Sequence, residues 1–174
     1  MFKRFIYLTA VICIACAVLC SCGKKVDEEA QEKVKEVEIK TFTEGVSVPP
    51  KPAPLPADLV IDVPGPIKAK YKAVVMGVGN RKTKEVKKFT VKLGGTAKVP
   101  GTGYTIKVFD YLPNWTFRGK VVTSKDDKPE DPAVRAEIYE KGKKVFDGFI
   151  FQKHKTPSFV TDEYAVGLLE AVSR

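Results

Sequence analysis

Apolar and polar side chains alternate with a period of two from residue 68 onward, and this pattern constrains the fold more than any other feature. In the segment 86–93, Phe89, Val91 and Leu93 fall on one face, while Lys88, Thr90 and Lys92 fall on the other. Turn-forming residues separate this segment from others of the same kind, at 71–78, 96–99, 104–112, 116–124, 134–139 and 145–152. The pattern predicts an all-β fold, a single small antiparallel sandwich or partly open barrel of seven or eight strands.

Charge and proline content divide the chain into a signal peptide, a charged then proline-rich linker of net charge −3, and a β-domain of net charge +10, at residues 1–21, 22–66 and 67–174. In the linker, residues 26–40 carry apolar side chains at helical spacing, which leaves a short helix and an irregular segment both open. The prolines from Pro49 to Pro66 favour polyproline II, a semi-rigid spacer of roughly 55 Å. At the other end of the chain, residues 164–172 fit an edge strand or a short closing helix, and a strand is favoured.

The N-terminal segment has the layout of an export signal. Lys3 and Arg4 precede an apolar run that ends in Leu19-Cys20-Ser21-Cys22. This layout resembles the lipobox of bacterial lipoproteins, a family in which the signal is removed before the cysteine and the cysteine is acylated with fatty acids such as palmitate. The resemblance implies a lipid at Cys22 and a place in the bacterial cell envelope. In such lipoproteins an Asp after the cysteine would signal retention in the inner membrane, and here that position is Gly23. The resemblance therefore favours the periplasmic leaflet of the outer membrane, with the cell surface as the alternative.

A membrane-spanning helix and a metal site both fit this segment less well. A transmembrane helix needs about 20 apolar residues, and this run is shorter, with Lys24 and Lys25 close behind it. A metal site would need thiolates that face a common point, but its four cysteines would lie on or beside a segment due for removal: Cys13, Cys16, Cys20 and Cys22. With the signal removed, no thiol and no disulfide would remain.

Three pieces of the β-domain carry a resemblance to a known family. They are a turn and strand that end in Leu112-Pro113, a strand that begins with Asp131-Pro132-Ala133, and the segment Gly148-Phe149-Ile150-Phe151. Together they resemble the exported domain of unknown function 2155 family over roughly residues 70–172, although Asp131 stands where that family's pattern has Asn. The resemblance implies an envelope location and a β-rich fold, and it brings no catalytic residues. The same order of elements is faintly similar to the β-domain of membrane proteins in cytochrome c maturation.

Positive charge is concentrated in the first predicted hairpin. Residues 68–98 hold ten Lys and Arg but only one acid, Glu85, which gives net +9. Clustered cations attract anionic surfaces in a salt-dependent way, so the candidates for contact with an anionic envelope surface or protein partner are Arg81, Lys82, Lys84, Lys88 and Lys92. The plainer interpretation is a solvated face whose lysines protect the hairpin edge from aggregation. Nucleic acid is not expected after export, because no aromatic residues alternate with these cations to stack bases.

Aromatic residues gather around the turn at Pro113-Asn114. Tyr111 and Trp115 are candidate aromatic contacts of a binding pocket, although packing in the core or at a corner is the commoner role of such side chains.

The remaining motifs are typical of ordinary loops and turns. His154 lies between two lysines without an acid beside it, which is typical of an exposed loop. The acidic stretch at 126–131 lacks the spacing of calcium loops, and Gly101-Thr102-Gly103 lacks the strand-to-helix setting of a phosphate loop. The sequence therefore predicts no metal and no cofactor.

The function predicted from these features is that of a lipid-anchored envelope protein that acts as a binding or assembly module and not as an enzyme. Two alternatives stay open. One is an envelope hydrolase whose carboxylates, such as Asp110 and Glu137, come together only in the fold. The other is an accessory factor for the assembly of cytochromes or membrane complexes.

Overall fold

The structure, a computed structural model, describes residues 55, 56 and 58–174. These residues form an all-β sandwich, which confirms the predicted fold class. The elements of the first half are β1 (Val60–Ile61), α2 (Gly65–Lys70), β2 (Tyr71–Asn80), β3 (Val86–Lys92), β4 (Thr96–Lys98) and β5 (Tyr104–Leu112). Those of the second half are β6 (Trp115–Arg118), β7 (Val121–Ser124), β8 (Ala133–Glu140), β9 (Lys143–Phe151), β10 (Phe159–Val160) and β11 (Tyr164–Ser173).

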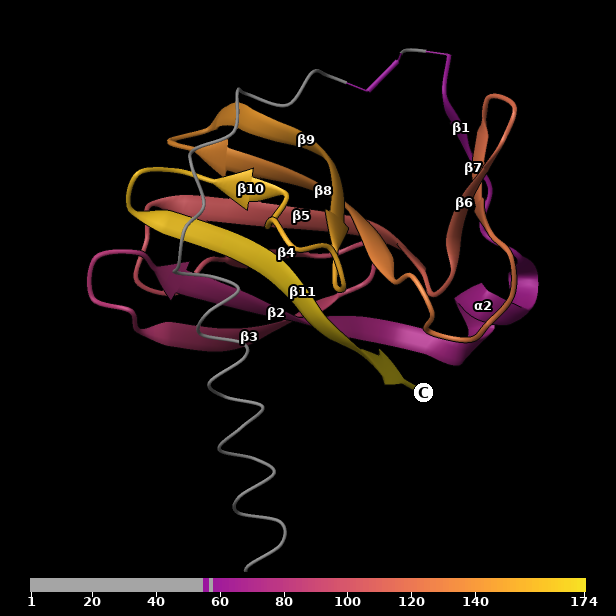
Figure 1. Ribbon diagram of the computed structural model, residues 1–174, viewed down its shortest axis with the longest axis horizontal. Coiled ribbons are helices and arrows are strands. Elements are labelled where there is room, and N and C mark those ends of the chain that lie inside the picture. The colour runs from indigo at the N-terminus through magenta and orange to yellow at the C-terminus, as the bar shows by residue number, and fades with distance from the viewer. Residues whose placement is uncertain (1–54, 57) are drawn as a thin grey trace, which may run out of the picture. The chain divides into compact units, whose positions relative to one another are not determined.

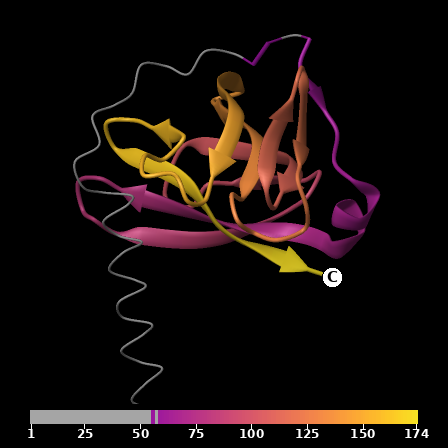
Figure 2. The ribbon, with the colours of Figure 1, turned by 45° about the vertical axis from the view of Figure 1, so that its right-hand side comes forward.

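The strands form three sheets. Two have four strands each, in the orders β10-β11-β2-β3 and β4-β5-β8-β9, and every pairing within them is antiparallel. They stack on each other, and the small sheet β1-β7-β6 stands at one end, on the side where α2 lies (Figures 1 and 2). Residues 164–172 are a strand, as favoured from the sequence, because they pair along nearly the whole of β2. The expected edge position is wrong, since β10 pairs with the other side of β11.

The core lies between the two larger sheets. Directly paired residues point to the same face of a sheet, and the inward pairs are fully buried, as in Val74–Val91, Val108–Ala136 and Ile106–Ile138. The lysines and threonine that alternate with Phe89 and Val91 are exposed. The period of two therefore defines the two faces of β3 as the sequence predicts.

The described residues form eleven strands, more than the seven or eight expected. β1 and β10 have two residues each, too short to show alternation. The expected single strand at 116–124 is wrong: it is a hairpin, β6 and β7, that turns at Gly119 with φ 64°. Glycine adopts that left-handed conformation without the steric cost that a side chain would add.

The end of the proline-rich segment takes part in the fold. β1 pairs in parallel with β7, and the Val60 and Asp62 amides donate to the carbonyls of Lys120 and Val122 at 3.0 and 2.9 Å. Proline in the first turn suits a helix, because the amide it lacks has no partner there, and α2 begins in this way. α2 buries Ile67 against the core.

Asn114 joins the β5–β6 turn to the loop between β7 and β8. Its side chain is 2% exposed, and its Nδ2 donates to the carboxylates of Asp126 and Glu130 at 3.2 and 3.1 Å. The backbone amide of Asn114 donates to the Ser124 hydroxyl at 2.8 Å, and its backbone carbonyl accepts from the backbone amide of Lys125 at 2.8 Å. One buried amide side chain thus fixes the course of a polar loop.

Replacing Asn114 with Ala should destabilise the fold. The change removes both donors to carboxylates, and a lost hydrogen bond to a charged group costs about 1–3 kcal/mol. Urea unfolding of the purified protein measures this loss. The exposed neighbour Lys128 provides the control, since Lys128→Ala should change the free energy of unfolding by less than about 0.5 kcal/mol. Equal stability of the two variants would contradict the role assigned to Asn114.

Candidate functional site

A cleft of about 230 Å³ lies beside α2. Its walls come from the approach to α2, from α2 itself, from the start of β2, from the turn after β3, from β5 and from the residue after β11. We call this the α2 cleft, and its lining residues are Val63, Ile67, Lys68, Tyr71, Lys72, Leu93, Gly94, Phe109, Asp110, Tyr111 and Arg174. Backbone hydrogen bonds hold the walls together, from Leu93 to Lys72, from Gly94 to Phe109 and from Arg174 to Lys70, at 3.0, 3.2 and 2.9 Å.

A break in the register of β5 creates one wall of the cleft. Val108 pairs with Ala136 and Tyr111 pairs with Val134, so Phe109 and Asp110 have no partners on β8. Strict alternation from Ile106 and Val108 would place the Asp110 carboxylate in the core, where an unpaired charge is very costly. The bulge avoids this cost, and both unpaired residues line the cleft. Bulges are common next to functional sites because they redirect side chains in this way.

Tyr111 forms the floor of the α2 cleft together with Tyr71. Their rings meet edge to face with centroids 4.8 Å apart, and Tyr111 is only 3% exposed. Burial, with a smaller contribution from the nearby Tyr71, raises the pKa of Tyr111. The phenol therefore stays neutral at physiological pH. Of the two aromatic candidates from the sequence, this one lies in the cleft.

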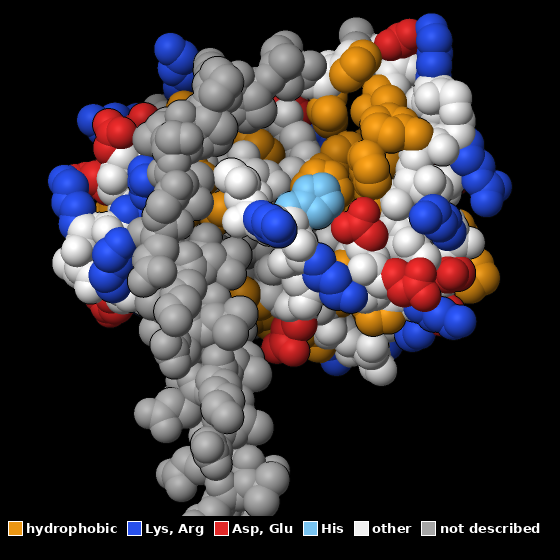
Figure 3. All heavy atoms as spheres, in the orientation of Figure 1, with side chains coloured by type: hydrophobic (Ala, Val, Ile, Leu, Met, Phe, Trp, Pro, Cys, Tyr) orange, Lys and Arg blue, Asp and Glu red, His pale blue; other side chains and the backbone are white. Residues whose placement is uncertain are grey.

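Trp115, the other candidate, belongs to a different cluster. Its ring contacts those of Phe117, Phe151 and Phe149, with centroids 4.8, 5.2 and 6.2 Å apart. Its Nε1 is buried without a hydrogen-bond acceptor among the described residues, and Phe117 is 53% exposed. A hydrophobic patch is visible beside the pale blue histidine in Figure 3, and the His154 ring stacks on Phe151 at 3.8 Å.

The five basic candidates lie along the β2–β3 hairpin. Lys88 and Lys92 are exposed on the outer face of β3, opposite Gly77 and Ala73 of β2. Because β3 is the last strand of its sheet, both side chains stand at an open edge. Lys84 is exposed in the turn, where its φ is 62°.

The tip of this hairpin is tied to the turn before β11. The Arg81 guanidinium donates to the Thr161 carbonyl at 2.7 Å, and the Lys82 amine lies 2.6 Å from the Glu163 carboxylate. That carboxylate raises the pKa of Lys82 through its hydrogen bond. Of the five candidates, these two therefore have a structural role as well as a charge.

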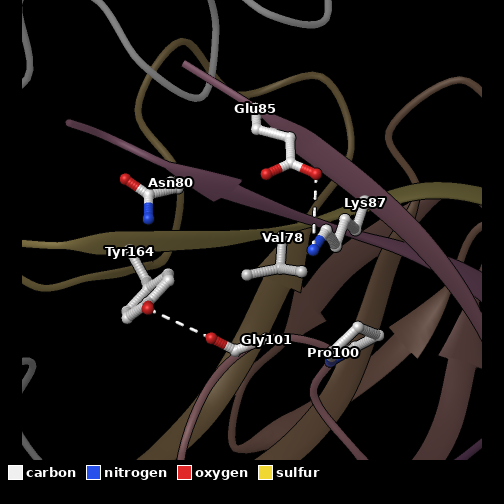
Figure 4. Close-up of a pocket in the computed structure, with 7 residues that line it drawn as sticks. All are labelled: Val78, Asn80, Glu85, Lys87, Pro100, Gly101 and Tyr164. Carbon is white, nitrogen blue, oxygen red and sulfur yellow. Dashed lines mark hydrogen bonds and ion pairs between the residues drawn. The ribbon is translucent and has the colours of Figure 1, made fainter. Parts of the chain in front are cut away.

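A second hollow lies at the same end of the molecule (Figure 4). Its volume is about 40 Å³, and Figure 4 shows the Tyr164 hydroxyl donating to the Gly101 carbonyl and the Lys87 amine beside the Glu85 carboxylate, at 3.1 and 3.3 Å. A water molecule takes about 30 Å³ in the liquid. This hollow has room for one or two waters and not for a substrate.

The acidic loop uses its carboxylates within the fold. Asp126 and Glu130 accept from Asn114, Asp127 pairs with Lys70 at 2.8 Å, and Asp131 lies 3.4 Å from His154. Within the described residues no group of three or more His, Cys, Asp and Glu side chains is placed to hold a metal ion.

The two carboxylates of the hydrolase alternative lie in different places. Asp110 lines the α2 cleft and Glu137 does not. Glu137 accepts from the Tyr139 hydroxyl at 2.6 Å and from the Lys144 amine at 3.0 Å, and that amine also reaches Asp147 at 2.6 Å. Arg135 forms a further ion pair with Asp147.

These contacts change the pKa values of the charged groups. Burial alone would raise the pKa of Glu137 and of Asp147. Hydrogen bonds from Tyr139 and Lys144 nevertheless lower the pKa of Glu137 below its ordinary value. Lys144 and the nearby Arg135 lower the pKa of Asp147 in the same way. The two carboxylates in turn raise the pKa of Lys144.

Sequence reasoning missed most of the α2 cleft. Lys68 and Lys72 are neighbours in the chain, but Arg174 is far from both and joins them only because β11 ends where α2 ends and β2 begins. One signal was available, since a charged Asp110 at an inward position of an alternating strand indicates a bulge.

Cys22 lies outside the described residues, so the lipobox stays a prediction. No helix of the described part is long and apolar enough to cross a membrane. No family model, curated protein or solved structure matches the chain.

The cluster around Lys144 predicts a pH dependence. Because the folded-state pKa values of Glu137 and Asp147 are lowered, their contribution to stability is present at neutral pH and is lost as the pH falls through those values. Lys144→Gln should therefore be less stable than the wild type at pH 7, and the difference should narrow toward pH 3. Urea unfolding at several pH values measures it, with Lys155→Gln as the exposed control. A difference that does not change with pH would contradict the role of these ion pairs.

Proposed function

We propose that the protein is a lipid-anchored binding module of the bacterial cell envelope and that the basic β2–β3 hairpin contacts an anionic envelope surface. The observation that carries the proposal is the pair of lysines exposed on the outer face of an edge strand, Lys88 and Lys92. The lipid at Cys22 supplies the attachment, and the part of the proline-rich segment that precedes β1 separates the attachment from the domain.

The spacing of these lysines favours an extended surface over a single small anion. Four residues along a strand span about 14 Å, which exceeds the Debye length of about 8 Å at physiological salt. Each ammonium group therefore acts on its own anion, as repeating lipid headgroups or charged glycans would allow. Near such a surface each lysine contributes about 1 kcal/mol.

Protection of the β3 edge is the competing role for these lysines, and it makes a different demand on the side chains. Lysine discourages pairing with another strand because it is charged, and glutamate at the same positions would discourage it as well. An anionic partner, in contrast, tolerates only the positive charge. Charge reversal therefore separates the two roles.

The aromatic cluster gives some support to an assembly role. Phe117 is half exposed at the edge of the cluster around Trp115, and exposed aromatic patches often mark contacts with other proteins. We therefore keep assembly of a membrane complex as a second candidate function.

Replacing Cys22 with Ala should abolish the attachment. Without the sulfur, no acyl chain can be added, and the protein should move from the membrane fraction to the soluble fraction and lose its label from radioactive palmitate. Replacing Ser21 with Ala, which keeps a small residue before the cysteine, should preserve both. A membrane-bound, labelled Cys22→Ala protein would refute the anchor.

The double variant Lys88→Glu, Lys92→Glu should weaken binding of non-lipidated protein to isolated envelopes. We expect a loss of at least about tenfold at low salt, from the reversal of two charges near an anionic surface, and added salt should weaken the wild type in the same direction. Co-sedimentation measures the bound fraction.

A matched control carries the same change of net charge elsewhere. Lys143 and Lys155 are exposed and lie off the basic hairpin, so Lys143→Glu, Lys155→Glu should bind nearly as the wild type does. If the two double variants bind alike at low salt, the contact through β3 is wrong.

A further inference from the structure

The α2 cleft combines an aromatic floor with an excess of positive charge. Its lining includes the aromatic residues Tyr71, Phe109 and Tyr111, the aliphatic residues Val63, Ile67 and Leu93, and the charged residues Lys68, Lys72, Arg174 and Asp110. We propose that this cleft is a second binding site, separate from the surface formed by Lys88 and Lys92, for a small molecule made of one aromatic ring and one carboxylate.

The volume of the cleft limits the size of the ligand. A cavity of about 150 Å³ holds one benzene molecule, and sites for drug-sized ligands begin at about 300 Å³. The α2 cleft, at about 230 Å³, lies between these values. It therefore accommodates one ring with a short substituent, and not a fused ring system, a nucleotide or a long acyl chain.

The aromatic walls are held in place before a ligand arrives. The Lys107 amine and the Arg135 guanidinium lie 4.7 and 5.4 Å from the centre of the Phe109 ring, within the range of cation–π attraction. Tyr71 is fixed by its contact with Tyr111 and by a hydrogen bond of 3.3 Å from its hydroxyl to the Asp127 carbonyl. Rings fixed in this way lose little conformational entropy when a ligand binds.

The charges select a monoanion. Three cations from different elements, Lys68 of α2, Lys72 of β2 and Arg174 after β11, line the cleft with one carboxylate, Asp110. An ammonium ligand would meet net repulsion, whereas a carboxylate gains charge-assisted hydrogen bonds. Asp110 disfavours a second negative group, because like charges brought close in a partly desolvated site repel.

The site can be tested with three probes of nearly the same shape. Phenylacetate, 2-phenylethanol and phenethylamine differ in the charge of the group attached to the ring. Isothermal titration calorimetry of the full-length protein should show that phenylacetate binds with a dissociation constant of about 1 mM or lower. This affinity is within the binding free energy per non-hydrogen atom that small ligands reach. The alcohol should bind about tenfold more weakly, and the amine more weakly still.

Variants of the cationic residues separate charge from shape. Lys72→Gln and Arg174→Gln should each weaken phenylacetate at least about threefold while leaving the weaker affinity for the alcohol unchanged. Phe109→Leu, which keeps an apolar side chain in the bulge, should weaken both probes. Lys143→Gln, an exposed lysine outside the cleft lining, is the matched control and should change neither.

Three results would overturn the proposal: no heat of binding with phenylacetate at 10 mM, equal affinity for the three probes, or unchanged phenylacetate affinity in the double variant Lys72→Gln, Arg174→Gln. Circular dichroism of the folded variants accompanies each titration. Because Lys88 and Lys92 do not line the cleft, the Lys88→Glu, Lys92→Glu protein should keep its affinity for phenylacetate even if it fails to bind envelopes.

Discussion

Burial of apolar side chains between the two four-stranded sheets is the interaction on which the rest of the structure depends. No cysteine follows Cys22 in the sequence, so no disulfide joins the two sheets. The inward residues of the central strands therefore carry the stability, and the largest fully buried side chains include Met76, Ile106, Ile138 and Ile150. Fully burying one such side chain contributes about 1.5–3 kcal/mol, so the sheets must stay in register for the domain to remain folded.

The same core accounts for the position of the α2 cleft. Ile106 and Val108 fix the inward face of one half of β5, and Tyr111 takes the inward position opposite Val134 in the other half. Phe109 and Asp110, between the two halves, cannot alternate in step with both inward faces. They therefore have no paired partners on β8, and they line the cleft. The site is thus a by-product of keeping a carboxylate out of the core, at the one place along β5 where the paired register shifts.

Much of the sandwich could be predicted because its strands alternate and their turns are marked by glycine, proline or asparagine. The segment 86–93 shows this best, since both of its faces follow from the sequence. Features that depend on distant partners could not be predicted in this way. β1 is a strand only because β7 lies beside it, and Arg81 is held by a carbonyl that is eighty residues away.

The candidate sites follow the same division. Clustered charge on one hairpin is local in the sequence, so Lys88 and Lys92 could be identified together and do share a face. Tyr111 and Trp115 are also near each other in the chain, yet a buried turn at Pro113 and Asn114 sends their side chains to different clusters. The α2 cleft needs the chain ends of three elements to meet, and no local pattern encodes that meeting.

The parallel pairing of β1 with β7 has a mechanical consequence. Any pull on the domain from its N-terminal side reaches β1 before it reaches the larger sheets, because β1 and α2 precede β2 in the chain. β1 is held by a small number of contacts, among them the backbone hydrogen bonds donated by Val60 and Asp62 and the ion pair of Asp58 with Lys120 at 2.5 Å. Under tension these contacts would break before the pairing of the larger sheets does, so the two four-stranded sheets would keep their register while the segment before β2, which supplies Val63 and Ile67 to the α2 cleft, yields.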